Sequence, residues 1–205
     1  MPGVQAHWQG PGLEAWEAWS PRQVSRILGS ATPVWCVVGG WAIDLWLGRV
    51  TRPHSDIEIA APRSDFVELR RFFEPGYRLY AVGDGESFGL DGNQPMPSEK
   101  HQCWIADSTA GRWRLDLMLE PGDSQTWVCR RDERIKEPRG RMIDRSDGIP
   151  FLKPEGVLLY KAKAHRAKDQ ADFESCLPHL SPAARSWLAT YLSLVQPGHQ
   201  WLDAL

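Results

Sequence analysis

The sequence lacks the features that mark membrane-spanning and secreted proteins. No apolar run approaches the roughly 20 residues that a bilayer-spanning helix needs. The N-terminal stretch MPGVQAHWQGPGLEAW has neither a basic start nor an apolar segment, so it does not resemble a secretory signal peptide. We therefore expect a cytoplasmic protein that has no membrane partner.

Cysteine is scarce and widely spaced, and neither sign of charge is in large excess. The four cysteines, Cys36, Cys103, Cys129 and Cys176, form no CxxC or CxxH pair, which argues against a structural zinc site and favours reduced, buried thiols. The net charge of −2 and the pI of about 6.3 give no indication of a nucleic-acid partner. The sequence does not indicate an oligomeric state.

Tryptophan, by contrast, is abundant, with 11 in 205 residues. Core filling is the favoured interpretation of these side chains. The alternative is that some of them form stacking walls for a ligand that contains a ring, such as a purine or a sugar.

The order of predicted elements indicates an α/β (α+β) fold with a mixed sheet flanked by helices. Apolar or alternating runs predict strands at 33–38, 54–60, 77–82, 103–107 and 112–120, and helices follow Ser20, Gly40 and Ser64. Residues 83–100, rich in glycine, proline and acids, are expected to form a loop. Three helical patterns follow Pro150. We expect a catalytic domain over 1–148 and a small helical region over 149–205.

Two carboxylates, Asp56 and Glu58, share one face of the strand predicted at 54–60, while Ile57 and Ile59 take the other. Like charges on one face repel each other unless something offsets them. A bound Mg²⁺ ion would offset the repulsion between the two carboxylates, because Mg²⁺ takes oxygen ligands and is shared with substrate phosphates. The alternative is an ordinary solvated strand face.

A third carboxylate, Asp116, lies on the polar face of the strand predicted at 112–120. It can join the metal site or accept a proton from an attacking hydroxyl. The alternative is a structural ion pair with Arg112 or Arg114. Together the three acids suggest phosphoryl or nucleotidyl transfer, in which positioning and charge neutralisation provide most of the catalysis.

Gly39 and Gly40 lie between the strand predicted at 33–38 and the helix that follows. Small residues there allow backbone amides to approach a phosphate, and a helix N-terminus favours negative charge.

The combined stretch GGWAIDLWLGRVTRPHSDIEIA resembles the signature of the polymerase β-type nucleotidyltransferase superfamily. It is most similar to the aminoglycoside 2''-adenylyltransferase and lincosamide nucleotidyltransferase branch. The resemblance implies that Gly39 and Gly40 hold the nucleotide phosphates and that Asp56 and Glu58 bind Mg²⁺. It also implies that Asp116 is the general base on the acceptor hydroxyl. Antibiotic-modifying relatives often carry Asp where Glu58 stands, whereas the wider superfamily admits Glu.

The resemblance further implies nucleotide contacts from Arg52 and His54, just ahead of the acids, and from Lys161 and Lys168 in the helical segment. His54 and the two lysines each have a structural alternative. His54 can steady its loop by hydrogen bonding. The lysines can belong to a solvated basic helix face with Asp169 and Asp172 as local partners.

The activity implied is Mg²⁺-dependent transfer of a nucleoside monophosphate, AMP in the first instance, from ATP or another NTP to a hydroxyl of a small antibiotic. One alternative is an enzyme of the same fold, like a toxin, that modifies tRNA or protein. Another is a non-catalytic nucleotide-binding module.

Overall fold

The computed structural model describes residues 9–29, 31, 33–164 and 166–205. The first eight residues, which form part of the stretch judged not to be a signal peptide, lie outside this range. The chain folds into two compact units, one built from the stretch up to Trp35 together with Ser55–Ser124, the other from Cys36–His54 and Gln125–Leu205. Packing alone defines these units, so the domain boundary expected between residues 148 and 149 stays a proposal.

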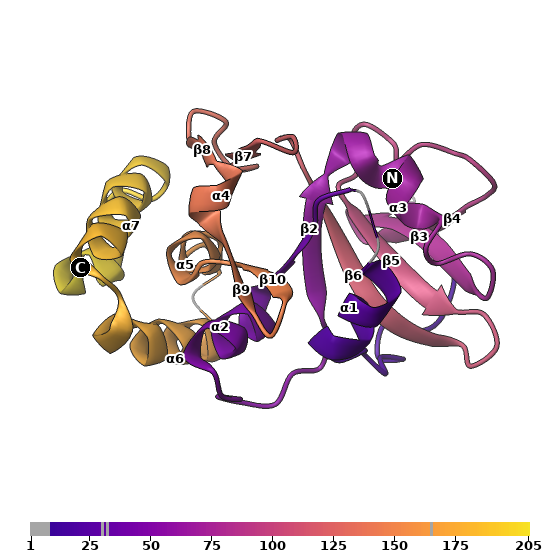
Figure 1. Ribbon diagram of the computed structural model, residues 1–205, viewed down its shortest axis with the longest axis horizontal. Helices are drawn as coiled ribbons and strands as arrows, with labels where there is room; N and C mark the ends of the chain where they lie inside the picture. The colour runs from indigo at the N-terminus through magenta and orange to yellow at the C-terminus, as the bar shows by residue number, and fades with distance from the viewer. Residues whose placement is uncertain (1–8, 30, 32, 165) are drawn as a thin grey trace, which may run out of the picture. The chain divides into compact units, whose positions relative to one another are not determined.

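The first unit contains a mixed sheet with the strand order β4-β3-β5-β6-β2 (Figure 1). Only β2 and β6 run parallel, and the other neighbours are antiparallel. The elements are α1 (Pro21–Leu28), β2 (Glu58–Pro62), the 3-10 turn η1 (Arg63–Asp65), α3 (Phe66–Arg70), β3 (Tyr77–Gly83), β4 (Glu86–Leu90), β5 (Gln102–Asp107) and β6 (Arg112–Glu120).

The β5–β6 hairpin supplies the centre of this unit. Alternation places Trp113, Leu115, Leu117 and Leu119 on one face of β6, and all four are at most 2% exposed. Asp116 and Glu120 lie on the opposite face of β6, yet both are buried as well. The alternation of residues along β6 predicts that Asp116 and Glu120 face water. In this sheet both are instead shielded from water, which the alternation alone does not predict.

The second unit contains a small sheet in which β1 (Cys36–Val38) runs parallel to β10 (Ile149–Leu152), and β10 pairs antiparallel with β9 (Ile143–Ser146). Helix α2 (Gly39–Leu47) follows β1 directly and packs against α5 (Pro154–Lys161) and α6 (Ala167–Cys176). The remaining elements are β7 (Thr126–Val128), β8 (Lys136–Pro138), α4 (Arg139–Met142), η2 (Leu177–His179), α7 (Pro182–Val195) and η3 (Gln200–Ala204).

The predicted fold class is confirmed. Local chemistry explains where helix α1 begins and where helix α2 ends. Ser20 caps α1 with Gln23 in a reciprocal capping box, and Pro21 is the first helical residue. Gly48 ends α2 with φ of 68°, a left-handed conformation that suits glycine.

Several local expectations were wrong. The strand predicted at 54–60 begins only at Glu58, so Asp56 lies ahead of it. Residues 86–90 form strand β4 within the predicted loop, because they pair antiparallel with β3. The helix expected after Ser64 is shorter, and the Ser64 hydroxyl donates to Asp65 and does not cap it. The hairpin of β9 and β10 extends past Pro150, where only helices were expected.

Within the described residues, no helix is both long and apolar enough to span a membrane.

Candidate active site

Two of the predicted acidic residues of the first unit face each other on the parallel strands β2 and β6. Glu58 is the first residue of β2, and its Cα partner on β6 is Asp116. The Asp116 backbone N–H donates to the Ile57 carbonyl at 3.0 Å, which fixes this register. Asp56 lies two residues before Glu58, outside the strand, and both side chains are half-buried. The register therefore brings Glu58 and Asp116 together, as the sequence predicted.

Asp116 is held in a buried setting that perturbs its carboxyl group. It is 5% exposed, and Gln102 on β5 donates its Nε2 to Oδ2 at 2.6 Å. Its other oxygen, Oδ1, is buried without a hydrogen-bond partner of ordinary geometry. Burial raises the pKa of Asp116 well above its usual range, the charges of Glu58 and Asp56 add to the rise, and hydrogen bonding from Gln102 and Trp104 opposes it. This carboxyl is therefore a strong proton acceptor once it is ionised.

The side chains as they lie do not form a closed metal cage. Throughout the residues that the structure describes, no group of three or more His, Cys, Asp or Glu side chains is arranged to hold a metal ion. The assignment of Asp56, Glu58 and Asp116 as metal ligands stays a prediction.

The glycine turn belongs to the second unit, where β1 passes directly into α2. Gly39 has φ of +65°, which favours glycine, and the preceding Val38 makes no side-chain cap to the helix. The first N–H groups of a helix have no intrahelical acceptors, so this end of α2 can receive an anion.

Gly40 has a second reason to be glycine. A Cβ at this position would lie 2.3 Å from Arg52 Nη2 and 2.6 Å from His54 Cε1. Those distances are too short for any real Cβ contact, so Arg52 and His54 pack directly against the backbone of the turn.

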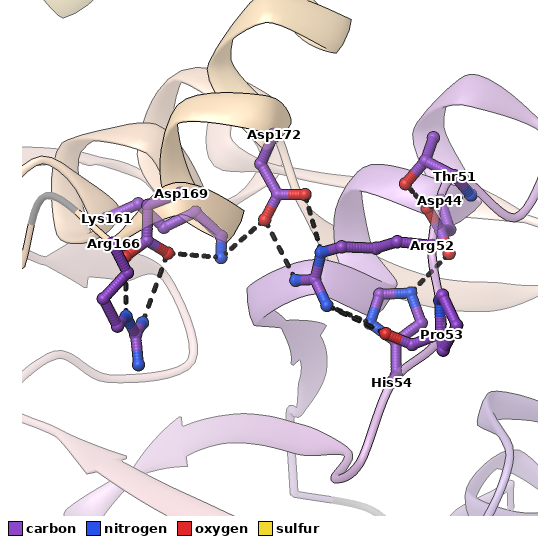
Figure 2. Close-up of polar contacts among 9 residues, drawn as sticks. All are labelled: Asp44, Thr51, Arg52, Pro53, His54, Lys161, Arg166, Asp169 and Asp172. Atoms are coloured by element: carbon purple, nitrogen blue, oxygen red, sulfur yellow. Dashed lines mark hydrogen bonds and ion pairs between the residues drawn. The ribbon is translucent and has the colours of Figure 1, made fainter.

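Arg52 is held by a bidentate ion pair within the second unit (Figure 2). Its Nε and Nη2 each donate to an Asp172 carboxylate oxygen at 3.0 Å. Its Nη1 reaches the Pro53 carbonyl at 3.2 Å and His54 Nδ1 at 3.1 Å. At least four of the five guanidinium N–H groups are therefore used inside the protein.

His54 is fixed in one tautomer by its two neighbours. An arginine can only donate, so Nδ1 of His54 accepts from Arg52 and the ring proton is on Nε2. Nε2 then donates to Asp44 Oδ2 at 2.6 Å, and the Thr51 hydroxyl donates to the other oxygen of Asp44 at 2.5 Å. The ring also lies on Trp41, with 4.4 Å between ring centroids. His54 is thus a neutral, anchored ring, in keeping with the steadying role left open above.

The two predicted lysines differ in environment. Lys161 at the end of α5 is 8% exposed, and its ammonium contacts Asp169 at 3.1 Å and Asp172 at 2.8 Å. Arg166 Nε pairs with Asp169 at 2.7 Å. Lys168, on α6, is exposed. Direct nucleotide contacts by Arg52, His54, Lys161 and Lys168 stay predictions.

The two aspartates of α6 are ionised in this setting. Burial by itself raises the pKa of each, but ion pairing outweighs burial and leaves both pKa values below 3.8. Arg166 and Lys161 act on Asp169, and Arg52 and Lys161 act on Asp172. The sequence suggested only local partners for these acids. The pair between Arg52 and Asp172 spans 120 positions and left no sequence signal.

Gln102 is the residue of the site that sequence reasoning missed. It lies on β5, where Gln102 pairs with Met118 and Trp104 pairs with Asp116. The predicted β5–β6 hairpin is the sequence feature that could have revealed it, because the register of the hairpin places Gln102 and Trp104 near Asp116.

The mixed sheet with its flanking helices matches solved structures of antibiotic-resistance and adenylyltransferase proteins. The chain aligns with the solution structure of the antibiotic-resistance factor ANT(2'')-Ia (TM-score 0.53, 19% identity, covering 84% of this chain and 89% of that one). It also aligns with ANT(2'')-Ia in complex with adenylyl-2''-tobramycin (0.55, 20%, covering 85% and 97%). A further match is the lincomycin-bound lincosamide antibiotic adenylyltransferase LnuA (0.52, 13%, covering 82% and 97%).

Sequence similarity is more local. The family model of the aminoglycoside-2''-adenylyltransferases matches residues 22–79. The curated 2''-aminoglycoside nucleotidyltransferase of Escherichia coli is 44% identical over 55 residues, and one from Klebsiella pneumoniae is 50% identical over 55 residues. Each alignment covers 25% of this chain and 30% of the relative, so the chain matches about a third of their length. The solved structures therefore share the fold of this chain, and the sequence match to the aminoglycoside-2''-adenylyltransferases is confined to residues 22–79.

Proposed function

We propose that this protein is a Mg²⁺-dependent nucleotidyltransferase that moves AMP from ATP to a hydroxyl of a small antibiotic of the aminoglycoside or lincosamide type. The observation that carries the proposal is Asp116, a buried carboxyl with a raised pKa, facing Glu58 across two parallel strands. The acceptor class is supported by the relatives, whose names specify 2''-aminoglycoside nucleotidyl transfer.

Asp56, Glu58 and Asp116 fit a divalent cation by their chemistry. They supply only oxygen donors, and burial together with the negative charges of Glu58 and Asp56 raises the pKa of Asp116, a repulsion that a cation beside the three carboxylates would offset. When bound there, Mg²⁺ would neutralise charge on the triphosphate.

The chain's own groups account for the remaining steps. Gln102 occupies Oδ2 of Asp116, which leaves Oδ1 to take the proton of the acceptor hydroxyl. The hydroxyl oxygen forms a bond to the α-phosphorus, the bond from that phosphorus to the pyrophosphate oxygen breaks, and pyrophosphate leaves. The backbone N–H groups that begin α2 at Gly39 and Gly40 bind phosphate oxygens.

The test is transfer of label from α-³²P nucleotides to a panel of aminoglycosides and lincosamides in the presence of Mg²⁺. We expect a labelled acceptor with ATP and none when EDTA replaces Mg²⁺. A protein that binds ATP by calorimetry but labels no member of the panel would refute the acceptor class. A protein that binds no nucleotide would refute the proposed function as a whole.

A further inference from the structure

Asp172 is the centre of a charge network that lies within the second unit (Figure 2). Its carboxylate, 3% exposed, contacts both Arg52 and Lys161. With His54 neutral, the network holds three cations, Arg52, Lys161 and Arg166, against three carboxylates, Asp44, Asp169 and Asp172. Because most of these groups are buried, removing one charge leaves another without compensation.

The network ends on the glycine turn. Arg52 Nη2, which is bonded to Asp172, is also the atom nearest to the position that a Cβ on Gly40 would occupy. His54 packs beside it and is held by Asp44 on α2. A shift of Arg52 therefore changes the surface against which the turn packs.

We infer that Asp172 is a positioning residue: through Arg52 it holds the Gly39–Gly40 turn in the conformation that receives the nucleotide phosphates. The inference rests on the proposed function for the role of that turn. It assigns Arg52 a supporting role, since at least four of its five N–H groups are committed to protein acceptors. The carboxylate of α6 thus acts on nucleotide binding without touching the nucleotide.

The direction in which one substitution changes ATP affinity separates this positioning role from direct phosphate binding by Arg52. Asp172→Asn removes a negative charge and releases Arg52. If Arg52 contacted the triphosphate, the freed guanidinium and the lost negative charge would leave ATP affinity unchanged or raise it. If Asp172 positions the turn, the same variant binds ATP less tightly, because misplaced groups lose their alignment with the phosphates.

The experiment is isothermal titration of Mg²⁺-ATP into wild type, Asp172→Asn and the control Glu174→Gln, below the melting temperature of each protein. Glu174 lies on the same helix, is exposed, and accepts from the Gln170 side chain. We expect about tenfold weaker binding for Asp172→Asn, because the groups of the turn lose their alignment with the phosphates, and wild-type binding for the control. Affinity of Asp172→Asn equal to or above that of wild type overturns the inference.

A second measurement does not depend on nucleotide. The amide NMR signals of Gly39 and Gly40 are expected to shift in Asp172→Asn and to stay in place in Glu174→Gln, and unchanged signals in both would overturn the inference. If wild type binds no ATP, the proposed function fails while these signals still decide whether Asp172 positions the turn. Should Asp172→Asn not fold, Asp169→Asn carries the same two tests with smaller expected changes, because Asp169 reaches Asp172 only through Lys161.

Discussion

Replacing Gly40 by alanine tests whether the turn is packed as tightly as the structure shows. In an ordinary helix this change stabilises by about 0.5–1 kcal/mol. Here the new methyl group would lie 2.3 Å from Arg52 Nη2 and 2.7 Å from His54 Nδ1. Neither group can move freely, because Asp172 holds the guanidinium at 3.0 Å and Asp44 holds the imidazole at 2.6 Å.

The expected cost follows from these contacts. Overpacking costs about 1–3 kcal/mol, and separating a fully buried ion pair costs about 3–5 kcal/mol. Arg52 is 21% exposed and can recover part of its solvation, so we expect a net loss of about 2 kcal/mol. For a chain of this size, that loss corresponds to a melting temperature lower by about 4–8 °C.

The assay is thermal and urea denaturation of Gly40→Ala, wild type and the control Gly140→Ala. Gly140 lies in α4 of the same unit, and a Cβ there would meet nothing within 4 Å. The control should be as stable as wild type or slightly more so. If Gly40→Ala also matches or exceeds wild type, then Arg52 and His54 do not pack on the turn as described.

Three further predictions concern charge and protonation. Without Mg²⁺, Asp116→Asn should raise the free energy of unfolding at pH 7, because burial of the ionised carboxylate is unfavourable in the wild type. The gain should be about 1.4 kcal/mol for each unit by which folding raises the pKa of Asp116. A variant that is less stable than the wild type in urea titration would contradict this. The folded-state pKa of Asp169 is below 3.8, so its ion pairs contribute stability that is complete above the unfolded pKa and is lost as the pH falls through the folded one. The urea midpoints of wild type and Asp169→Asn should accordingly differ at pH 6, and the difference should shrink as the pH falls below the ordinary carboxyl range. A difference that does not shrink would argue against the pairing. Burial raises the pKa of Cys176 to about 12, and all four cysteines are buried, so a disulfide reagent at pH 8 should label the native protein far more slowly than the urea-unfolded chain. Equal labelling rates would contradict that burial.

The acidic part of the candidate site could be read from sequence because its signals are local. Alternation placed Asp116 on the polar face of its strand, and the stretch from Gly39 to Ile59 carried a recognisable motif. The structure adds that β2 and β6 are parallel neighbours, which turns two separate strand patterns into the facing pair Glu58 and Asp116.

The supporting contacts could not be predicted in this way. The partners of Arg52 and Lys161 depend on how α2, α5 and α6 pack, and no periodicity encodes the meeting of Arg52 with Asp172. The need for glycine at position 40 likewise comes from side chains that follow α2. Strand β4 was missed because glycine and acidic residues in 83–100 resemble a loop, while its pairing to β3 is set by the sheet.

The central claim is that Asp116 accepts the proton during nucleotidyl transfer. Its most direct test is the rate of ³²P transfer from α-labelled ATP to an antibiotic acceptor by wild type, Asp116→Asn and Asp91→Asn. Asp91 is a control from the same unit, 84% exposed and paired only loosely with Arg78 at 3.7 Å. We predict a loss of about 10²–10⁴-fold for Asp116→Asn with an unchanged circular dichroism spectrum, and a wild-type rate for Asp91→Asn. A wild-type rate from Asp116→Asn would contradict the account.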